Sequence, residues 1–236
     1  MSTAPTDTGA RAAVCLHGFL RTGLSMMMVA RHLRRCGWTT VNSPTHRYEL
    51  VDMAEIGAQV ARRIRQASTE AGGVPVDVIT HSMGGLALRA ALAHAPPIHR
   101  AVMLAPPNQG AEMAARWRAR LPLHQLGWDP FSALLPENAP ALPTPNEHPV
   151  DIGILIGGTG ATQGFNPFLD GDNDGKVRLV EAQLPGAREV RTVNARHPAV
   201  VWRPDVLDLA VRFLRTGTFG DADADGHVHP LPALPD

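Results

Sequence analysis

Short apolar segments alternate along the chain with segments whose apolar residues recur every three or four positions. The first kind is typical of buried strands and the second of amphipathic helices. Their alternation predicts an α/β fold, with a mostly parallel central sheet and helices on both faces. The expected strands are 12–16, 38–41, 76–79, 101–104, 151–156 and 188–193, and the expected helices lie near 26–36, 53–71, 83–95 and 206–213.

One long stretch interrupts this alternation. Residues 108–149 are rich in proline and aromatic side chains and leave room for one helix, near 111–120. An insertion of this length in a compact domain is typically a lid or a cap, or it is disordered. The predicted organisation is a flexible N-terminus over 1–11, one domain over 12–215 with a cap near 108–149, and a loosely ordered tail over 216–236.

Composition restricts the partners and the compartment. The 236 residues include 22 basic and 22 acidic side chains, so the formal net charge is zero and no basic field attracts nucleic acid or an anionic membrane. No apolar run reaches transmembrane length and no secretory signal is visible, which favours a cytoplasmic protein without stable membrane insertion, unless a signal was trimmed. Cys15 and Cys36 suit free thiols, although their count permits one disulfide. The oligomeric state stays open.

Ser82 lies between an expected strand and an expected helix, in the segment Thr-His-Ser-Met-Gly-Gly at 80–85. A sharp strand-to-helix turn would lift its hydroxyl clear of the sheet and aim the free amides of the helix N-terminus at developing negative charge. Gly84 and Gly85 would relieve the crowding. The alternative is that Ser82 only caps the helix. The preceding strand and the paired glycines favour a nucleophile.

This segment resembles the G-x-S-x-G elbow of the α/β-hydrolase superfamily, in particular of bacterial lipases and carboxylesterases. The chain departs from that motif at Thr80, where a β-branched residue replaces the first glycine and leaves less room. The resemblance implies the α/β-hydrolase fold over about 12–214 and a Ser-His-Asp triad. In these proteins the triad follows the chain order serine, acid, histidine.

The resemblance also implies an oxyanion hole. His17-Gly18-Phe19 directly follows the first expected strand, as an HG-type loop does in such lipases. The implied donors are the backbone amides of Phe19 and Met83. His17 would then hold the loop by hydrogen bonding. The competing interpretation is an ordinary turn with His17 on the surface.

The same resemblance selects the acid and the base. The run Asn173 to Val177 is similar to the Asn-Asp-Gly-x-Val loop of bacterial lipases, which makes Asp174 the acid and Asp172 the fallback. His197 follows the last expected strand and precedes the last helix, where the base of this family lies, although a surface histidine is the alternative. His81 is expected to be structural or to face the substrate.

A second pattern overlaps the acid. Residues 170–181 fit the calcium loop of an EF-hand, with Asp170, Asp172, Asp174 and Glu181 as ligands. An EF-hand needs a helix on each side, yet glycines precede the run and Pro185-Gly186 follows it. A partial repeat at 221–226 lacks the closing glutamate. We therefore expect no metal here.

The resulting expectation is a cofactor-free serine hydrolase that cleaves a small-molecule or lipid ester through an acyl-enzyme. An acyltransferase, a thioesterase or an amidase would use the same triad. A calcium-responsive binding module with an inert serine is the alternative from another class.

Overall fold

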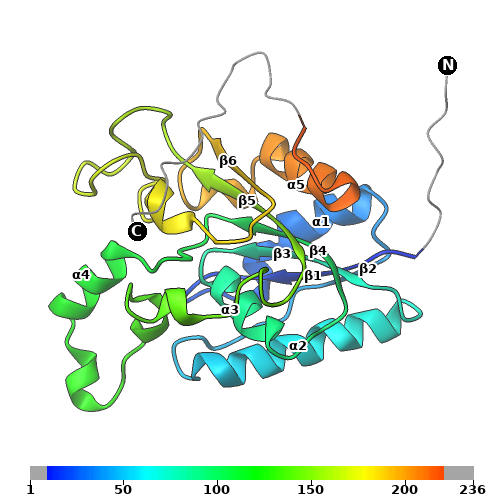
Figure 1. The fold of residues 1–236 in the computed structure, drawn as a ribbon, viewed down its shortest axis with the longest axis horizontal. Coiled ribbons are helices and arrows are strands. Elements are labelled where there is room, and N and C mark those ends of the chain that lie inside the picture. The colour runs from blue at the N-terminus through cyan, green and yellow to red at the C-terminus, as the bar shows by residue number, and fades with distance from the viewer. Residues whose placement is uncertain (1–9, 221–236) are drawn as a thin grey trace.

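The computed structural model describes residues 10–220 and contains a six-stranded sheet in the order β2-β1-β3-β4-β5-β6 (Figure 1). Every pair of neighbouring strands is parallel. The central strands are buried along most of their length, because helices cover the sheet on both sides. The strands are β1 Ala12–Leu16, β2 Thr40–Asn42, β3 Val76–His81, β4 Ile98–Leu104, β5 Asp151–Gly157 and β6 Glu189–Val193.

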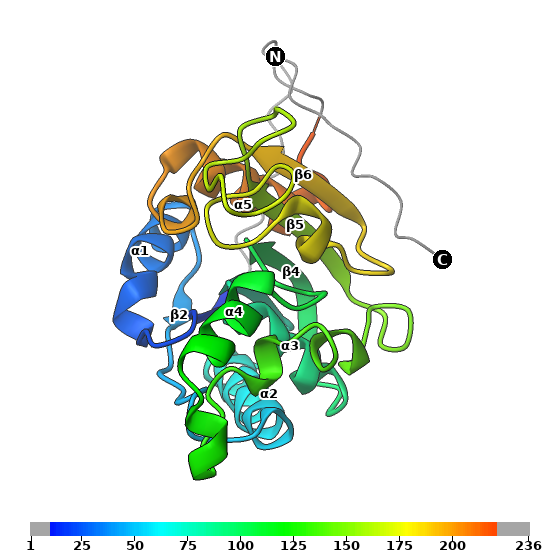
Figure 2. The same cartoon turned by 90° about the vertical axis from the view of Figure 1, so that its left-hand side faces the viewer.

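The helices form two layers around this sheet. Helices α2 and α3 pack against each other on one face, and α1 lies beside α5 on the other (Figures 1 and 2). Asp52 begins α2 by accepting a hydrogen bond from the Glu55 amide at 2.9 Å. The α-helices are α1 Met27–Arg35, α2 Met53–Glu70, α3 Met83–Leu92, α4 Glu112–Arg120 and α5 Pro204–Thr216. Short 3-10 turns cover Gly23–Met26, Leu123–Leu126, Ser132–Leu134, Ala139–Ala141, Leu179–Ala182 and Ala199–Val201.

The predicted α/β architecture is confirmed, with one strand misplaced. The segment 38–41 is not a strand throughout, because β2 is Thr40–Asn42. Trp38 lies before it, buried, with its indole nitrogen donating to Asp77 at 2.8 Å. Its apolar ring fills the core beside the sheet rather than extending the strand.

The connections after β1 and β3 diverge to opposite faces of the sheet. The chain leaves β1 toward α1 and leaves the neighbouring β3 toward α3 (Figure 1). Such a divergence opens a crevice at the carboxyl ends of the two strands, which is where ligands bind in open α/β sheets. Gly18 and Ser82 lie at this point.

The 108–149 segment contains α4 and three of the 3-10 turns, and it lies at the end of the sheet toward which the strands point (Figure 2). Its second half is packed into the core, with Phe131, Leu134 and Ala139 buried. The buried Arg89 of α3 donates at 2.5–3.2 Å to carbonyl oxygens of the segment, those of Asn108, Pro140, Leu142 and Pro143.

The ends of the described chain are packed into the domain. Arg11 pairs with the buried Asp77 at 3.0 Å, and Phe219 packs on Phe213 with ring centroids 4.8 Å apart. The rest of the expected N-terminal and C-terminal segments, and the partial calcium repeat at 221–226, lie outside the described residues. Within 10–220, no helix is long and apolar enough to cross a membrane. Cys15 and Cys36 are free thiols.

Candidate active site

Ser82 occupies a strained turn between β3 and α3. Its backbone angles are φ 52° and ψ −123°, a conformation that a residue with a side chain rarely adopts. The turn brings α3 against the end of β1, since a Cβ atom at Gly84 would lie 2.6 Å from the Leu16 carbonyl oxygen. Only glycine fits at that position. Thr80, at the position of the motif's first glycine, is accommodated inside β3 and is fully buried.

His197 and Asp174 are joined by two hydrogen bonds. His197 Nδ1 lies 2.6 Å from Asp174 Oδ2, and the His197 amide donates to the Asp174 carbonyl oxygen at 2.8 Å. Both side chains are buried. Because a carboxylate only accepts, Nδ1 carries the proton and Nε2 is left as the basic nitrogen.

The second oxygen of Asp174 is also occupied. Asp174 Oδ1 accepts from the amides of Lys176 at 2.9 Å and Val177 at 2.8 Å, which orients the carboxylate toward His197. Asp172, the fallback acid, points elsewhere. Its carboxylate accepts from the amides of Thr159 and Gly160 after β5, at 2.8 and 2.9 Å. The resemblance selected Asp174 and kept Asp172 as the fallback, and this geometry also favours Asp174.

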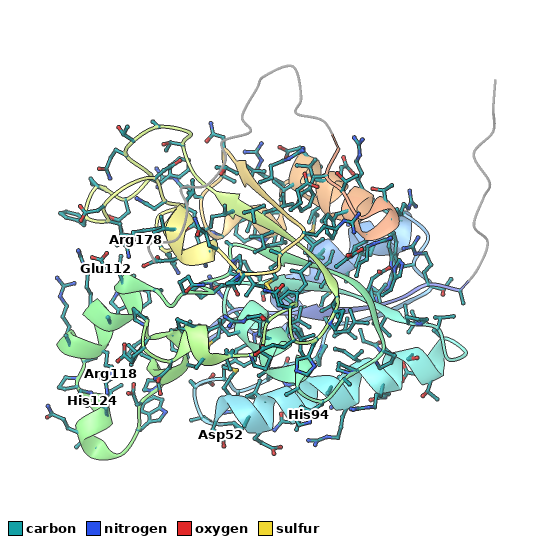
Figure 3. The ribbon with its side chains drawn as sticks, in the orientation of Figure 1. Asp52, His94, Glu112, Arg118, His124 and Arg178 are labelled. Atoms are coloured by element: carbon teal, nitrogen blue, oxygen red, sulfur yellow. The ribbon has the colours of Figure 1, made fainter. Side chains whose placement is uncertain are left out.

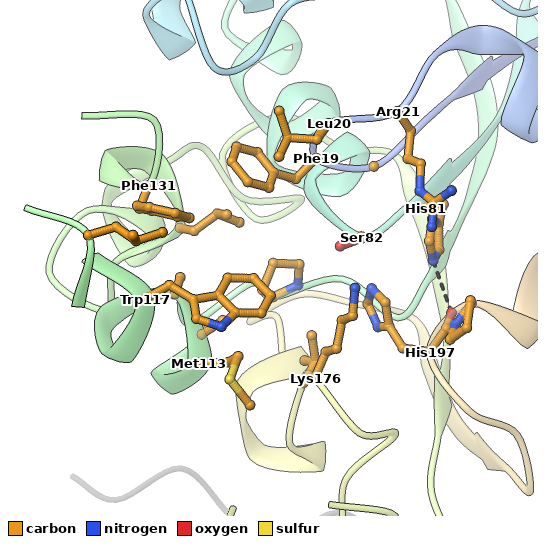
Figure 4. Close-up of a pocket in the computed structure, with 18 residues that line it drawn as sticks. Phe19, Leu20, Arg21, His81, Ser82, Met113, Trp117, Phe131, Lys176 and His197 are labelled. Carbon is orange, nitrogen blue, oxygen red and sulfur yellow. Dashed lines mark hydrogen bonds between the residues drawn. The ribbon is translucent and has the colours of Figure 1, made fainter. Parts of the chain in front are cut away.

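Ser82 and His197 line one pocket of about 490 Å³ at the carboxyl ends of the strands (Figure 4). The Ser82 hydroxyl points into this pocket, and the His197 ring lies nearby. Among the hydrogen bonds of the described residues there is none between the two side chains. Catalytic hydrogen bonds are often long before substrate binds and shorten in the complex.

The residues expected to supply the oxyanion hole lie on either side of Ser82. Met83 is the first residue of α3, so its amide has no partner within the helix. The loop after β1 approaches from the other side, because a Cβ atom at Gly18 would lie 3.2 Å from Ser82 Cβ. Phe19 follows in that loop and lines the pocket, with its ring 5.5 Å from that of Phe131.

His17 is buried and does not line the pocket. Its Nε2 accepts from the His46 amide at 2.9 Å, so Nδ1 is the donor to the Gly18 carbonyl oxygen at 2.8 Å. Burial lowers the pKa of His17, which keeps the ring neutral and able to accept. The surface alternative is wrong, and the ring fastens the loop after β1 to the chain after β2.

His81 lines the pocket beside His197, with the two ring centroids 4.9 Å apart. Its Nε2 donates to the His197 carbonyl oxygen at 3.1 Å. Burial, followed by the neighbouring charge of His197, lowers the pKa of His81 to about 3. A neutral His81 therefore supports the loop that carries His197.

The pocket wall away from the two histidines is apolar. Trp117 and Met113 of α4 line it together with Phe131 (Figure 4). The three aromatic side chains of the proline-rich segment differ in exposure. Phe131 is buried, Trp117 is half-buried, and Trp128 is 43% exposed and lies outside this pocket.

The carboxylates of the calcium pattern bind different partners instead of converging on one point. Asp172 binds the turn after β5, Asp174 binds His197, and Glu181 accepts from the Glu112 amide at the start of α4 at 2.8 Å. Arg178 pairs with both Glu181 and Glu112, at 3.0 and 3.1 Å (Figure 3). Asp170 is exposed. No three potential metal-ligating side chains come together anywhere in residues 10–220.

The sequence interpretation assigned no role to three basic residues that lie near the site. Arg21 and Lys176 line the pocket, and Arg89 holds the 108–149 segment. An arginine within the apolar run of α3 was the one available signal, because a buried guanidinium needs several acceptors. Nothing in the sequence indicated which way Arg21 and Lys176 point.

The family profile described as the alpha/beta hydrolase family matches residues 13–234. The chain belongs to the α/β-hydrolase family. No curated protein sequence matches it significantly. The expected superfamily is thus confirmed over nearly the whole chain.

Solved structures of two lipases and of a putative thioesterase share this fold at low sequence identity. The mature lipase BlEst2 of Bacillus licheniformis is 21% identical, with 91% of this chain and 94% of that one covered and a TM-score of 0.70. Lipase B of Aspergillus fumigatus is 19% identical over 93% and 57% of the chains, with a TM-score of 0.60. A putative thioesterase from Silicibacter sp. is 20% identical over 88% and 78%, with a TM-score of 0.57.

Proposed function

We propose that this α/β-hydrolase cleaves carboxylic esters through an acyl-enzyme on Ser82. The observation that carries the proposal is the strained Ser82 on a pocket shared with His197, whose Nδ1 is bound to the buried Asp174. A serine hydroxyl is a weak nucleophile until an imidazole accepts its proton. The carboxylate keeps the imidazole in the required tautomer and stabilises the imidazolium.

The first half-reaction forms the acyl-enzyme. Ser82 Oγ bonds to the acyl carbon while its proton passes to His197 Nε2, and the carbonyl oxygen becomes an oxyanion. The amides of Phe19 and Met83 donate to that oxyanion, and each such donor typically contributes about 2.7–4 kcal/mol to transition-state stabilisation. The bond from the acyl carbon to the alcohol oxygen then breaks, and His197 gives its proton to the leaving alcohol.

The second half-reaction uses water. A water oxygen attacks the acyl carbon and passes a proton to His197 Nε2. The bond to Ser82 Oγ then breaks, Oγ recovers the proton from His197, and the carboxylic acid leaves. These steps need only the triad, the two amides and water.

The 108–149 segment is the proposed cap of this site. Trp117 and Phe131 come from it and form the apolar wall of the pocket. An acyl chain bound there would lie against aromatic rings, out of contact with water, which favours an apolar acyl group. A small-molecule or lipid ester is the substrate class that this pocket suits.

Hydrolysis of para-nitrophenyl butyrate by the wild type, Ser82→Ala and His197→Ala tests the proposal. Each substitution should lower kcat by a factor on the order of 10⁴ to 10⁶, and the double variant should be no worse, because the two residues act as a unit. The matching thioester and anilide, assayed in parallel, should be poorer substrates. Full activity in either single variant, or a preference for the anilide, contradicts the proposal.

A further inference from the structure

The proposed active-site pocket has an apolar end and a basic end. Phe131 and Trp117 lie on one side of Ser82, Arg21 and His81 lie on the other, and Lys176 lies between Trp117 and His197 (Figure 4). The described residues that line the pocket include no carboxylate. Two cations therefore face a cavity that offers them no counter-ion.

Lys176 is held in place by the triad's own acid. Its amide donates to Asp174 Oδ1 at 2.9 Å, so the position of its backbone is coupled to that of His197. Its side chain is exposed at the pocket mouth, and Nζ lies 5.9 Å from the centroid of the Trp117 ring. Lys176 is the single lysine in the sequence.

Arg21 lies in the loop after β1, the loop that also carries Phe19, and it lines the pocket. Its amide donates to the Gly18 carbonyl oxygen at 3.2 Å, and its side chain is exposed. Within residues 10–220, neither the Arg21 guanidinium nor the Lys176 ammonium forms an ion pair or a side-chain hydrogen bond. Their charges reach the site, because both add to the effects of burial and of His197 that lower the pKa of His81.

The direction of the proposed reaction decides which part of a substrate meets these cations. His197 must give its proton to the leaving alcohol, so the alcohol portion lies on the His197 side of Ser82. Arg21 lies on that side, and the Lys176 ammonium lies beside the His197 ring, between it and Trp117 (Figure 4). Phe131 lies on the opposite side of Ser82. The acyl chain then occupies the apolar end and the alcohol portion occupies the basic end.

We propose that Lys176 and Arg21 select esters whose alcohol portion carries an anionic group, a carboxylate or a phosphate, and whose acyl chain is apolar. This inference rests on the proposed ester hydrolysis and specifies its substrate class. Both cations attract the anion before and during catalysis, and because neither forms an ion pair within the described residues, no internal ion pair must break first.

Matched aryl esters test this selection. The probes are para-octanoyloxybenzoate, para-octanoyloxyphenyl phosphate, the neutral methyl ester of the benzoate, and the cationic para-octanoyloxyphenyl trimethylammonium. The measured quantity is the ratio of kcat/KM for each charged probe to kcat/KM for the neutral one. Comparing variants with wild type by this ratio cancels differences in leaving-group reactivity.

Lys176→Met and Arg21→Gln should each lower the anionic-to-neutral ratio about tenfold, and the double variant should lower it further. Lys176→Glu should raise the ratio for the cationic probe, and Lys176→Arg should retain most of the wild-type preference. Added salt should narrow the wild-type ratio. Arg31→Gln is the matched control, because Arg31 is exposed on α1 outside the pocket, and it should leave every ratio unchanged.

A fall confined to the benzoate or to the phosphate would identify that anion as the one selected. Ratios unchanged in both single variants and in the double variant would overturn the inference while leaving ester hydrolysis intact. If the wild type hydrolyses none of the four esters nor para-nitrophenyl butyrate, the proposed function itself fails, and the inference fails with it.

Discussion

Asp174 fixes His197 at two points, with 2.6 Å between the imidazole Nδ1 and Asp174 Oδ2 and 2.8 Å between the His197 backbone amide and the Asp174 carbonyl oxygen. The same carboxylate binds the amides of Lys176 and Val177. One buried side chain thus shapes its own loop and sets the tautomer of the histidine. Loss of its charge and loss of its hydrogen bonds should therefore have separable effects.

Asp174→Asn should lower kcat by about 10⁴-fold with a small change in fold, because an amide can donate to His197 and stabilise the wrong tautomer. The assay is para-nitrophenyl butyrate hydrolysis, with circular dichroism to confirm folding. Asp170→Asn is the control, since Asp170 is exposed on the same loop. Equal activity in Asp174→Asn and the control would remove Asp174 from the triad.

Asp172→Ala should affect stability more than catalysis. Its carboxylate accepts from the amides of Thr159, Gly160 and Asn173, and these would be left without an acceptor. The expected loss is about 1–3 kcal/mol of unfolding free energy, which corresponds to a fall in Tm of several degrees. Asp172 should also give no rescue of Asp174→Ala. A large loss of kcat without a change in Tm would contradict this assignment.

Arg89→Met should loosen the 108–149 segment. The four carbonyl oxygens that the guanidinium binds would lose their donors, so we expect a destabilisation of about 3 kcal/mol or more and faster proteolysis within the segment. Limited proteolysis followed by mass spectrometry locates the first cleavage. Arg31→Gln, on the surface of α1, should behave as wild type. First cleavage outside 108–149 would show that Arg89 does not anchor this segment.

His81 should make the folded protein sensitive to acid. Its pKa falls from 6.5 to about 3 on folding, chiefly because the ring is buried. At a pH between these two values the unfolded chain therefore binds a proton at His81, whereas the folded chain does not. The stability that this contributes is complete above about pH 6.5 and is lost as the pH falls toward 3. His81→Asn removes this titration, because an amide does not ionise in this range.

The measurement is Tm against pH from 7 to 4. The plot for His81→Asn should be flatter than that for wild type. His94→Asn serves as the control, because His94 is exposed at the end of α3 (Figure 3). Identical slopes for His81→Asn and wild type would assign the acid sensitivity to other groups.

The sheet was predictable because its strands are short apolar runs, and burial on both faces makes such runs nearly continuous. The exception is Trp38, which is apolar but precedes its strand. Its ring is buried in the core and its indole nitrogen donates to Asp77, a residue far along the chain, so the local pattern could not show its place. The elbow at Ser82 was predictable because its glycines are demanded by backbone contacts, such as that of Gly84 with Leu16.

The sequence predicted Asp174 as the acid only through its resemblance to a known loop, with Asp172 as the fallback. The structural place of Asp172 depends on the amides of residues 159 and 160, which only the fold brings near. Burial of Phe131 was equally hidden, since a proline-rich segment has no periodicity to indicate which side faces the core. The basic end of the pocket depends on the direction of two side chains. Such directions follow from tertiary structure and leave no trace in a single sequence.

The role of Ser82 as the nucleophile is tested most directly by covalent labelling of the wild-type protein with an alkyl fluorophosphonate, which reacts with activated serines. Peptide mass spectrometry then locates the label. We expect one modified residue, Ser82, and we expect the label to be incorporated at the same rate as ester hydrolysis is lost. Ser82→Ala should take up no label, and His197→Ala should label far more slowly, because His197 activates the hydroxyl. Labelling of a different serine, or none at a concentration that labels a known serine esterase, would contradict the assignment of Ser82 as the nucleophile.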